Sequence, residues 1–422
     1  MKKSFGLLGE KLSHSFSPLI HRQLGEYDYP LYEVSPDKLD SFMTERSFDG
    51  INITIPYKQA VMPYCATLSD EARMIGSINT IIKDDDGVLH GHNTDYHGFR
   101  VMLERGGIDP NGKKVLVLGD GGAARTVRAV LNALGAREIV TISRRGDNHY
   151  GNIERHFDAG IIVNTTPVGM YPDNDNSPLR LTGFRQLIGV TDLIYNPTRT
   201  KLLLEAEQLG VPCVNGLAML VAQAEMASRL FLEKQADKPA TTARPELSEL
   251  IDKITALILK ETQNIALIGM PGCGKSTIGR LLAQAMGRPF ADIDERIVVA
   301  AGKSIPQIFA DDGEETFRCL ETRIIGEEAK RSGIVIATGG GVVTRQENLD
   351  LLRQNSLIVY MKRELNELVT DGRPLSRGVG IQALAEQRLP LYETWSDCAV
   401  QVEAKPEQTA ESIQKVIKGI WP

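Results

Sequence analysis

The stretch NIALIGMPGCGKST, residues 264–277, decides the fold of the second half of this 422-residue chain. An apolar run typical of a buried strand leads into Gly269, four further residues and Gly274-Lys275-Ser276, and a helical pattern follows. The glycines let backbone amides wrap a β-phosphate, Lys275 can reach the β- and γ-oxygens, and Ser276 offers a hydroxyl to Mg²⁺. The spacing therefore predicts a P-loop that binds ATP with Mg²⁺ beside a parallel sheet.

A second phosphate signature lies in the first half of the chain, at residues 113–124 (KKVLVLGDGGAA). A strand pattern runs into a Gly-x-Gly-x-x-Ala turn and an alanine-rich helical pattern, as in a dinucleotide-binding unit. The next strand pattern ends at Ser143, followed by Arg144 and Arg145. This end has no acid for a ribose 2′-hydroxyl, but two guanidinium groups can meet a 2′-phosphate. We therefore expect NADP(H) rather than NAD(H).

Short apolar runs alternate with helical patterns along the whole chain, which predicts α/β layers with parallel sheets. The length, with 42% apolar and 24% charged residues, predicts two or three globular domains. A net charge of -6 provides no basic stripe, which argues against a nucleic-acid partner. Nothing in the sequence indicates an oligomer.

Two features predict a cytoplasmic protein without a membrane segment. The first apolar run breaks after five residues at Glu10, too short for a signal-peptide core, and no apolar run reaches membrane-spanning length. The cysteines are odd in number and scattered, which argues against a disulfide framework or a zinc site. We expect five reduced thiols, at Cys65, Cys213, Cys273, Cys319 and Cys398.

Lys58 and Asp95, on separate segments of the first half, form a candidate catalytic pair. Reduction of a ketone needs such groups, because the alkoxide formed by hydride addition must receive a proton as it develops. Each residue also has a plain structural alternative. Lys58 could be a surface lysine, and Asp95 and Ser17 could cap the helices that follow them.

The motifs that follow the P-loop resemble shikimate kinase. They are DID at 292–294, FRCLE at 317–321, ATGGG at 337–341, RPL at 373–375 and RLPLY at 388–392. The resemblance runs from about residue 264 to the end and implies phosphorylation of the 3-hydroxyl of shikimate by ATP. It makes Asp294 the group that holds this hydroxyl and the candidate base, and it places Asp292 at Mg²⁺, directly or through water.

The same resemblance assigns the other kinase contacts. It implies a clamp on the substrate carboxylate by Arg318 and Arg388, and backbone amides near the ring at Gly339, Gly340 and Gly341. The implied ATP contacts are Gly269, Gly272, Cys273, Gly274, Lys275, Ser276, Thr277 and Arg373. Arg373 is the lid residue and is also a candidate catalytic residue. Mg²⁺ is assigned to Ser276 and Asp292. The lid stretch at 364–382 is several residues shorter than in the family and lacks its upstream arginine, so the adenine contacts stay open.

Residues 2 to about 231 resemble shikimate dehydrogenase. The motifs are HSFSPLIH at 14–21, NITIPYK at 52–58, SINT at 77–80, HNTD at 92–95, NTTPVGM at 164–170, DLIYNPTRT at 192–200 and GLAMLVAQA at 216–224. The resemblance implies reduction of 3-dehydroshikimate to shikimate, with Lys58 and Asp95 as the catalytic pair. Its implied substrate contacts are Ser15, Ser17, Thr54, Asn79, Asn93, Tyr195 and Gln223. Its implied NADP contacts are Gly119, Gly121, Gly122, Ala123, Ser143, Arg144, Arg145, Thr165, Gly216 and Met219.

These assignments define the expected domains. A polar stretch with a proline, EKQADKPATTAR at 233–244, predicts a linker, and the amphipathic stretch ELSELIDKITALILKE predicts a connecting helix. We expect an α/β substrate domain at 1–100 completed by 216–232, a Rossmann-like NADP domain at 101–215, the linker and helix at 233–262, and a P-loop kinase α/β/α domain with a parallel sheet at 263–422. The small-molecule substrates are then 3-dehydroshikimate, shikimate and ATP, in consecutive steps.

Three departures from the dehydrogenase pattern bear on NADP. Asp120 puts a carboxylate in the phosphate loop, Ala218 replaces a glycine, and only about fifteen residues separate Arg145 from the strand GIIVN. We expect a trimmed cofactor domain and weaker NADP binding. Two alternatives stay open: quinate as the first substrate, or one half as a non-catalytic ligand-binding module.

Overall fold

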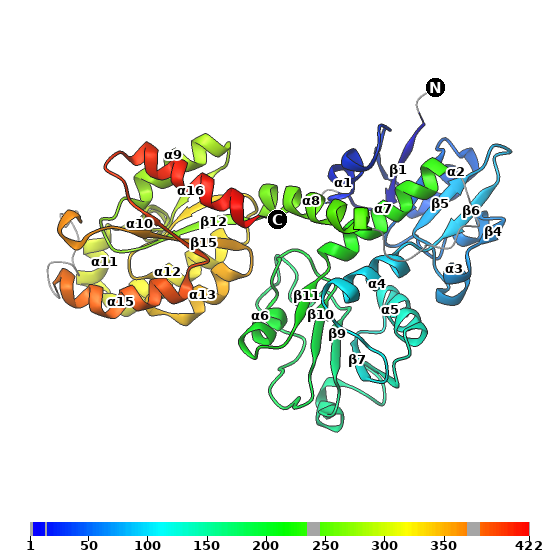
Figure 1. Cartoon of the computed structure of the whole chain (residues 1–422), viewed down its shortest axis with the longest axis horizontal. Coiled ribbons are helices and arrows are strands. Elements are labelled where there is room, and N and C mark those ends of the chain that lie inside the picture. Colours follow the sequence, from blue (N-terminus) through cyan, green and yellow to red (C-terminus); the bar gives the residue numbers. More distant parts are fainter. Residues whose placement is uncertain (1–2, 13–14, 234–244, 369–379, 422) are drawn as a thin grey trace. The chain divides into compact units, whose positions relative to one another are not determined.

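The structure is a computed structural model that describes residues 3–12, 15–233, 245–368 and 380–421 (Figure 1). The chain forms two compact units. Unit 1 comprises Met1–Met170, Asp175–Tyr195 and Glu205–Thr255, and unit 2 comprises Tyr171–Asn174, Asn196–Leu204 and Ala256–Pro422. The predicted lid residue Arg373 and residues 234–244 of the predicted linker lie outside the described residues.

The first sheet of unit 1 has six strands in the order β2-β1-β3-β5-β6-β4. Its strands are β1 Phe5–Gly9, β2 Leu31–Glu33, β3 Gly50–Ile53, β4 Thr67–Leu68, β5 Thr80–Lys83 and β6 Leu89–His92. The sheet is mixed, because β5 runs antiparallel to both β3 and β6. The turn between β5 and β6 is too short for a parallel crossover, so these two strands form a hairpin.

Among the described residues, five helices and two 3-10 turns belong with this sheet, and the last helix, α7, follows the second sheet in the sequence. They are α1 Ser17–Leu24, α2 Leu39–Glu45, α3 Asp70–Ile75, α4 Asp95–Arg105 and α7 Leu217–Glu233, with the 3-10 turns η1 Pro36–Lys38 and η2 Met62–Tyr64. A partly buried chain of hydrogen bonds joins α1 to α7: His21 Nδ1 lies 2.7 Å from the Tyr27 hydroxyl, which donates to Ser228. Burial lowers the pKa of His21 to about 3, so the imidazole is neutral at neutral pH.

The second sheet of unit 1 is wholly parallel, in the order β11-β10-β9-β7-β8. Its elements are β7 Lys114–Leu118, α5 Gly122–Ala133, β8 Glu138–Ile142, η3 Tyr150–His156, β9 Ile161–Asn164, β10 Gly189–Asp192, α6 Lys201–Gln208 and β11 Cys213–Asn215. All five residues of β7 are buried, as expected for a central strand of a parallel sheet. Between β8 and β9, residues 143–160 are all described and contain η3 but no strand, so the predicted trimming is confirmed.

Unit 2 contains a parallel sheet in the order β13-β14-β12-β15-β16. Its strands are β12 Asn264–Ile268, β13 Phe290–Asp292, β14 Val335–Ala337, β15 Ser356–Lys362 and β16 Cys398–Gln401. Its helices are α9 Lys275–Met286, α10 Ile293–Ala301, α11 Ile305–Asp311, α12 Gly313–Ala329, α13 Gln346–Arg353, α15 Ile381–Trp395 and α16 Pro406–Ile420, with η4 Val342–Thr344 and η5 Leu365–Glu367. The predicted α/β fold class and P-loop sheet are confirmed.

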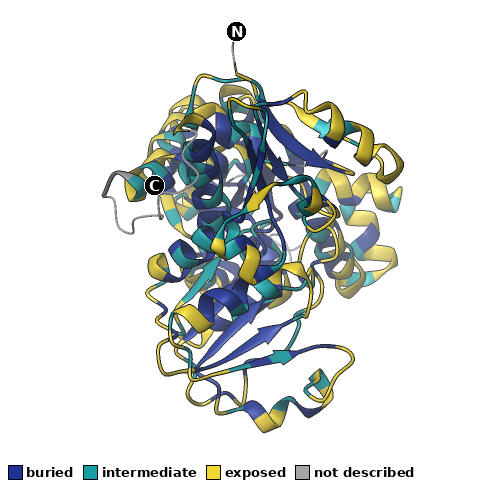
Figure 2. Cartoon of the chain, turned by 90° about the vertical axis from the view of Figure 1, so that its right-hand side faces the viewer, coloured by how far each residue is buried: buried dark blue, intermediate teal, exposed yellow. Residues whose placement is uncertain are grey.

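Most strand residues of both units are buried. Figure 2 shows the strands mainly as buried and the outer faces of the helices as exposed. The helix predicted for the stretch ELSELIDKITALILKE is confirmed as α8 Pro245–Thr262, whose Ile251, Ile254 and Ile258 are buried. Among the described residues, no helix has the length and apolar character needed to cross a membrane.

Candidate active sites

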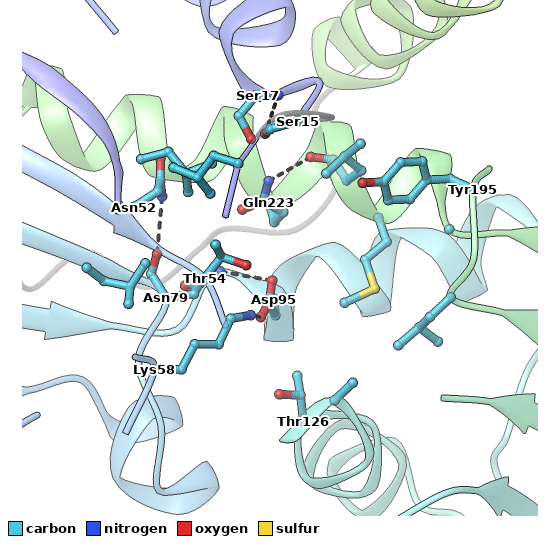
Figure 3. A pocket seen from close by; sticks show the side chains of 18 of the residues that line it. Ser15, Ser17, Asn52, Thr54, Lys58, Asn79, Asp95, Thr126, Tyr195 and Gln223 are labelled. Carbon is cyan, nitrogen blue, oxygen red and sulfur yellow. Dashed lines mark hydrogen bonds and ion pairs between the residues drawn. The ribbon is translucent and has the colours of Figure 1, made fainter. Parts of the chain in front are cut away.

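A cavity of about 620 Å³ in unit 1 collects most of the residues predicted to act in the first half of the chain (Figure 3). Eleven predicted residues line it: Ser15, Ser17, Thr54, Lys58, Asn79, Asp95, Ala123, Tyr195, Gly216, Met219 and Gln223. They come from the loops that follow β3 and precede β5, from α1 and the segment before it, from α4, α5 and α7, and from the loops after β10 and β11. The fold therefore brings together residues that lie more than 200 positions apart.

Lys58 and Asp95 are in direct contact in this cavity, with Lys58 Nζ 2.5 Å from Asp95 Oδ2. The other carboxylate oxygen accepts a hydrogen bond of 2.9 Å from the Asn79 amide. Asn79 is itself fixed, because its Oδ1 accepts from the backbone N–H of Thr94 at 2.7 Å. Asp95 is the first residue of α4, where the helix dipole favours its negative charge, but its carboxylate turns to Lys58 and Asn79. The helix-cap alternative for Asp95 is wrong.

The two serines lie at the start of α1, where the Oγ of Ser15 accepts from the Ser17 backbone N–H at 3.2 Å. No side-chain hydrogen bond caps this helix, so the capping alternative for Ser17 is wrong too. Ser17 also hydrogen-bonds to Tyr29, whose pKa is raised well above its usual value by burial. The Tyr29 hydroxyl donates to Asn52 Oδ1 at 2.7 Å. A buried polar chain thus starts at the serines and enters the sheet.

Asn52 continues this chain and lines the cavity, although sequence reasoning gave it no role. Its amide donates to Thr80 Oγ1 at 3.0 Å and to the carbonyl of Asn79 at 3.3 Å. The signal was present in the quoted stretch NITIP, where Asn52 is a polar residue inside an apolar strand. A buried polar side chain in such a strand needs partners, and here the partners lead to the residue that holds Asp95.

Of the two remaining predicted amides, Gln223 belongs to the cavity wall and Asn93 does not. Asn93 does not line the cavity; its amide donates to the Ser77 carbonyl at 2.9 Å. Its Oδ1 is buried and has no hydrogen-bond partner within the described part of the chain. Gln223 lines the cavity, with its amide bonded to the Leu220 carbonyl at 2.9 Å. Burial raises the pKa of Tyr195, so this phenol is neutral at neutral pH.

The predicted nucleotide turn follows β7 and has the geometry of a phosphate cradle. Gly119 has φ 101°, and a Cβ there would lie 2.9 Å from Thr165 Oγ1. At Gly121 and Gly122 a Cβ would meet no described atom within 4 Å, so a ligand can approach the backbone and the N-terminus of α5. This exposed turn fits a pyrophosphate.

Beyond the turn, the predicted 2′-phosphate contacts lie after β8. Arg144 and Arg145 are exposed, and the Ser143 hydroxyl donates to the Arg145 carbonyl at 2.7 Å. Burial raises the pKa of Tyr150, while the charges of Arg144 and Asp120 act on it in opposite directions. Arg144 and the carboxylate of Asp120 therefore both lie within electrostatic range of the Tyr150 hydroxyl.

A second cavity, of about 400 Å³, lies over the P-loop of unit 2. Among the predicted residues, Gly272, Gly274, Lys275, Ser276, Thr277, Asp294 and Gly340 line it. Lys275 is 7% exposed, and its Nζ donates to the carbonyls of Gly269 at 2.8 Å and Met270 at 3.0 Å. Gly269, Gly272 and Gly274 all have positive φ, which curls the loop around the ammonium group. This loop fits a triphosphate.

The two predicted acids after β13 have different surroundings. Asp292 accepts from the backbone N–H of Glu295 at 3.2 Å and thus caps α10, whereas Asp294 faces the cavity. A Cβ on Gly339 would lie 2.9 Å from Asp294 Oδ1 and 2.7 Å from Glu321 Oε1, so only glycine leaves these carboxylates their places. No cluster of three or more metal-binding side chains occurs among the described residues. A Mg²⁺ ion bound through a hydroxyl, a carboxylate and phosphates needs no such cluster.

The two predicted arginines flank the same glycines but do not line the cavity. Arg388 donates to the Gly340 carbonyl at 3.2 Å, and the Tyr392 hydroxyl donates to the same oxygen. Burial lowers the pKa of Arg388, and the charge of Arg318 adds to this effect. Arg318 is packed so closely on Gly341 that a Cβ there would lie 2.2 Å from its terminal nitrogens. Gly269, Cys273, Asp292, Gly339 and Gly341 also lie outside the lining.

Sequence reasoning missed one wall of this cavity, which consists of Thr338, Arg363, Val402, Glu403, Ala404 and Pro406. The last four follow β16, the edge strand of the sheet. The carboxyl ends of parallel strands meet at one edge, which is where the P-loop also lies. The strand order was therefore the missing information.

Comparisons with known proteins identify a family for each half of the chain. Residues 7–81 match the family model of the shikimate dehydrogenase substrate binding domain, and residues 271–418 match that of shikimate kinase. The NADP(+)-linked shikimate dehydrogenase of Clostridium perfringens strain SM101 is 37% identical over 257 residues, which cover 56% of this chain and 94% of that protein.

Solved structures give the same result for the first half. A chorismate mutase/shikimate 5-dehydrogenase fusion protein from Clostridium acetobutylicum is 35% identical with a TM-score of 0.54, covering 60% of this chain and 96% of that one. A quinate dehydrogenase from Corynebacterium glutamicum, solved in complex with NAD, is 27% identical with a TM-score of 0.53, covering 60% and 98%.

Proposed function

This chain belongs to the shikimate dehydrogenase family and carries a shikimate kinase domain, and we propose from this that it catalyses two consecutive reactions. The first is the NADPH-dependent reduction of 3-dehydroshikimate to shikimate. The second is the ATP- and Mg²⁺-dependent phosphorylation of shikimate to shikimate 3-phosphate. The product of the first reaction is the substrate of the second, so the chain is a bifunctional enzyme of chorismate and aromatic amino acid biosynthesis.

The contact between Lys58 and Asp95 carries the proposal for the reduction. NADPH, when bound, supplies the hydride to the ketone carbon, and the carbonyl oxygen becomes an alkoxide that must take up a proton. The Lys58 ammonium group donates this proton, and the Asp95 carboxylate holds the ammonium group in place. Asn79 keeps the second oxygen of Asp95 engaged, which orients the carboxylate towards Lys58.

The other lining residues bind the substrate. We propose that Ser15 and Ser17 hold its carboxylate and that Tyr195 and Met219 flank the ring and the nicotinamide. The ring hydroxyls are assigned to Thr54, Asn79, Asn93 and Gln223. The assignment of Asn93 rests on the family resemblance, because its side chain does not line the cavity and its Oδ1 is buried.

The curled P-loop around Lys275 carries the proposal for phosphoryl transfer. Lys275 neutralises charge on the β- and γ-phosphates, and Ser276 and Asp292 hold Mg²⁺. Asp294 receives the proton of the shikimate 3-hydroxyl as the new P–O bond forms and the bond to the ADP oxygen breaks. Arg318 and Arg388 bind the substrate carboxylate, and Arg373, outside the described residues, is assigned to the transferring group.

A coupled assay on the full chain tests the proposed function. With 3-dehydroshikimate, NADPH, ATP and Mg²⁺ together, we expect loss of absorbance at the reduced nicotinamide band, and ADP release only once shikimate has formed. Shikimate and ATP alone should release ADP without any nicotinamide. If ADP release failed while NADPH consumption proceeded, unit 2 would be the non-catalytic module that remains the alternative.

Arg144 and Arg145 should set the coenzyme preference. Replacing both with serine should lower the ratio of kcat/KM for NADPH to that for NADH by at least about tenfold, because charge-assisted bonds to the 2′-phosphate are lost. Arg155→Ser, an exposed arginine on η3, is the matched control. Equal use of both coenzymes by the unmodified chain would contradict these roles.

Quinate remains a second candidate for the first substrate, because a solved quinate dehydrogenase shares the fold. Oxidation rates with quinate and shikimate, each run with NADP⁺ and NAD⁺, separate the two assignments. We also propose a cytoplasmic location, which the five free cysteines support, and no nucleic-acid partner, which the net charge of -6 supports.

A further inference from the structure

Two carboxylates of the chain itself engage the guanidinium of Arg318. Its Nη1 donates to Glu321 Oε2 at 2.7 Å. Its Nε and Nη2 both donate to Glu314 Oε1, at 3.3 and 3.2 Å. Its two terminal nitrogens lie against Gly341, where an added Cβ would be 2.2 Å from each. A carboxylate docks on a guanidinium with two parallel hydrogen bonds, and the Nε–Nη2 edge that suits this geometry is already held by Glu314.

The two acidic partners differ sharply in their surroundings. The Glu321 side chain is fully buried, and burial raises its pKa, so it belongs to the interior of the unit. The Glu314 side chain is 52% exposed, on the first turn of α12. The Arg318 side chain is itself buried, at 6% exposure, but it keeps the fully buried Glu321 as a partner when Glu314 leaves, and a pair with one solvated partner is weaker than a fully buried one. Glu314 is therefore the partner that can leave.

We propose that Glu314 occupies the substrate-carboxylate position of Arg318 in the ligand-free kinase site and is displaced when shikimate binds. This inference rests on the proposed function, because it takes Arg318 as the group that receives the substrate carboxylate. In the exchange one carboxylate leaves and another arrives, so the charge around Arg318 and Arg388 stays balanced. Glu321 stays in place and holds the guanidinium in orientation for either partner.

Glu314 would then lower the affinity for shikimate and occupy the Nε–Nη2 edge of Arg318 until the substrate arrives. Removing its charge should strengthen substrate binding, since shikimate no longer competes with an internal carboxylate. The gain should be modest, about two- to fivefold, because a half-exposed ion pair contributes little. A residue that merely supported the clamp would show the opposite sign.

The test compares the full chain with Glu314→Gln by ADP release in the absence of any nicotinamide, so that only the kinase site turns over. We expect the KM for shikimate to fall about two- to fivefold and the KM for ATP to stay unchanged. The methyl ester of shikimate, which has no carboxylate, should show no such fall. Glu315→Gln is the matched control. The Glu315 side chain is adjacent in sequence to Glu314 and 83% exposed, but it pairs with Arg345 instead of Arg318.

An unchanged or raised KM for shikimate in Glu314→Gln would overturn the exchange, and so would an equal fall for the ester. The unchanged KM for ATP reports that the variant is folded. Failure of the proposed function looks different, because the unmodified chain would then release no ADP with shikimate. In that case the assignment of Arg318 and the inference fall together.

Discussion

Replacement of Lys58 with alanine should lower kcat/KM for NADPH oxidation with 3-dehydroshikimate by about 10²–10⁴-fold, the range that a positioned general acid contributes. Lys58 is the cationic partner of Asp95 in the cavity, at 2.5 Å, and its loss leaves the developing alkoxide without that proton donor. The rate of NADPH consumption at saturating and at limiting substrate separates kcat from KM. We expect most of the loss in kcat, because proton donation belongs to the transition state.

Two comparisons make this result specific. Lys83→Ala removes a lysine whose ammonium group donates to the Arg46 carbonyl outside the cavity, and it should leave the reduction unchanged. ADP release with shikimate and ATP should stay intact in Lys58→Ala, since the P-loop lies in unit 2. A Lys58→Ala chain that reduced 3-dehydroshikimate at the normal rate would remove Lys58 from the chemistry.

Most of the scaffold could be predicted from the sequence, because each central strand is a short apolar run beside a helical pattern. The run KVLVL became β7, buried along its whole length, and NIALI became β12. The mixed character of the first sheet was not predicted, since hydrophobic pattern shows that a strand exists but leaves its direction open. The direction of β5 follows from its short turn to β6.

The candidate sites could be predicted where a motif places chemistry within a few residues, as at the P-loop. The candidate sites could not be predicted where a contact joins segments that lie far apart in the sequence. Tyr29 lies 23 residues from Asn52 and belongs to no motif, so the polar Asn52 inside an apolar strand signalled that it needs partners but not which residue supplies them. The wall at residues 402–406 needed the strand order, and the hold of Glu314 on Arg318 needed side-chain positions on α12.

The sequence pattern alone could not assign the role of Asp95. An aspartate at the start of a helix serves equally well as a cap, so its position alone left two interpretations open. The structure decides between them because both carboxylate oxygens have other partners, Lys58 and Asn79. A site residue is thus identified by where its polar atoms point, which the chain's spacing does not reveal.

Replacement of Lys275 with alanine should lower kcat for ADP release with shikimate by at least about 10²–10³-fold, the cost of removing one preorganised charge from a transition state. Lys275 is buried within the loop, where its ammonium group bridges the carbonyls of Gly269 and Met270. It is thus held close to the position of the phosphates before ATP arrives. NADPH oxidation with 3-dehydroshikimate should continue at the normal rate, the reverse of the pattern expected for Lys58→Ala.

A second variant separates charge from geometry at this position. Lys275→Arg keeps the positive charge, but its planar guanidinium is larger than the ammonium group that the loop encloses, so we expect activity close to that of Lys275→Ala. Lys303→Ala, which removes a lysine paired with Asp312 away from the cavity, should leave ADP release unchanged. If Lys275→Ala kept normal phosphorylation, the P-loop would not be the phosphoryl-transfer site. The kinase assignment would then fail even though the fold and the family match stood.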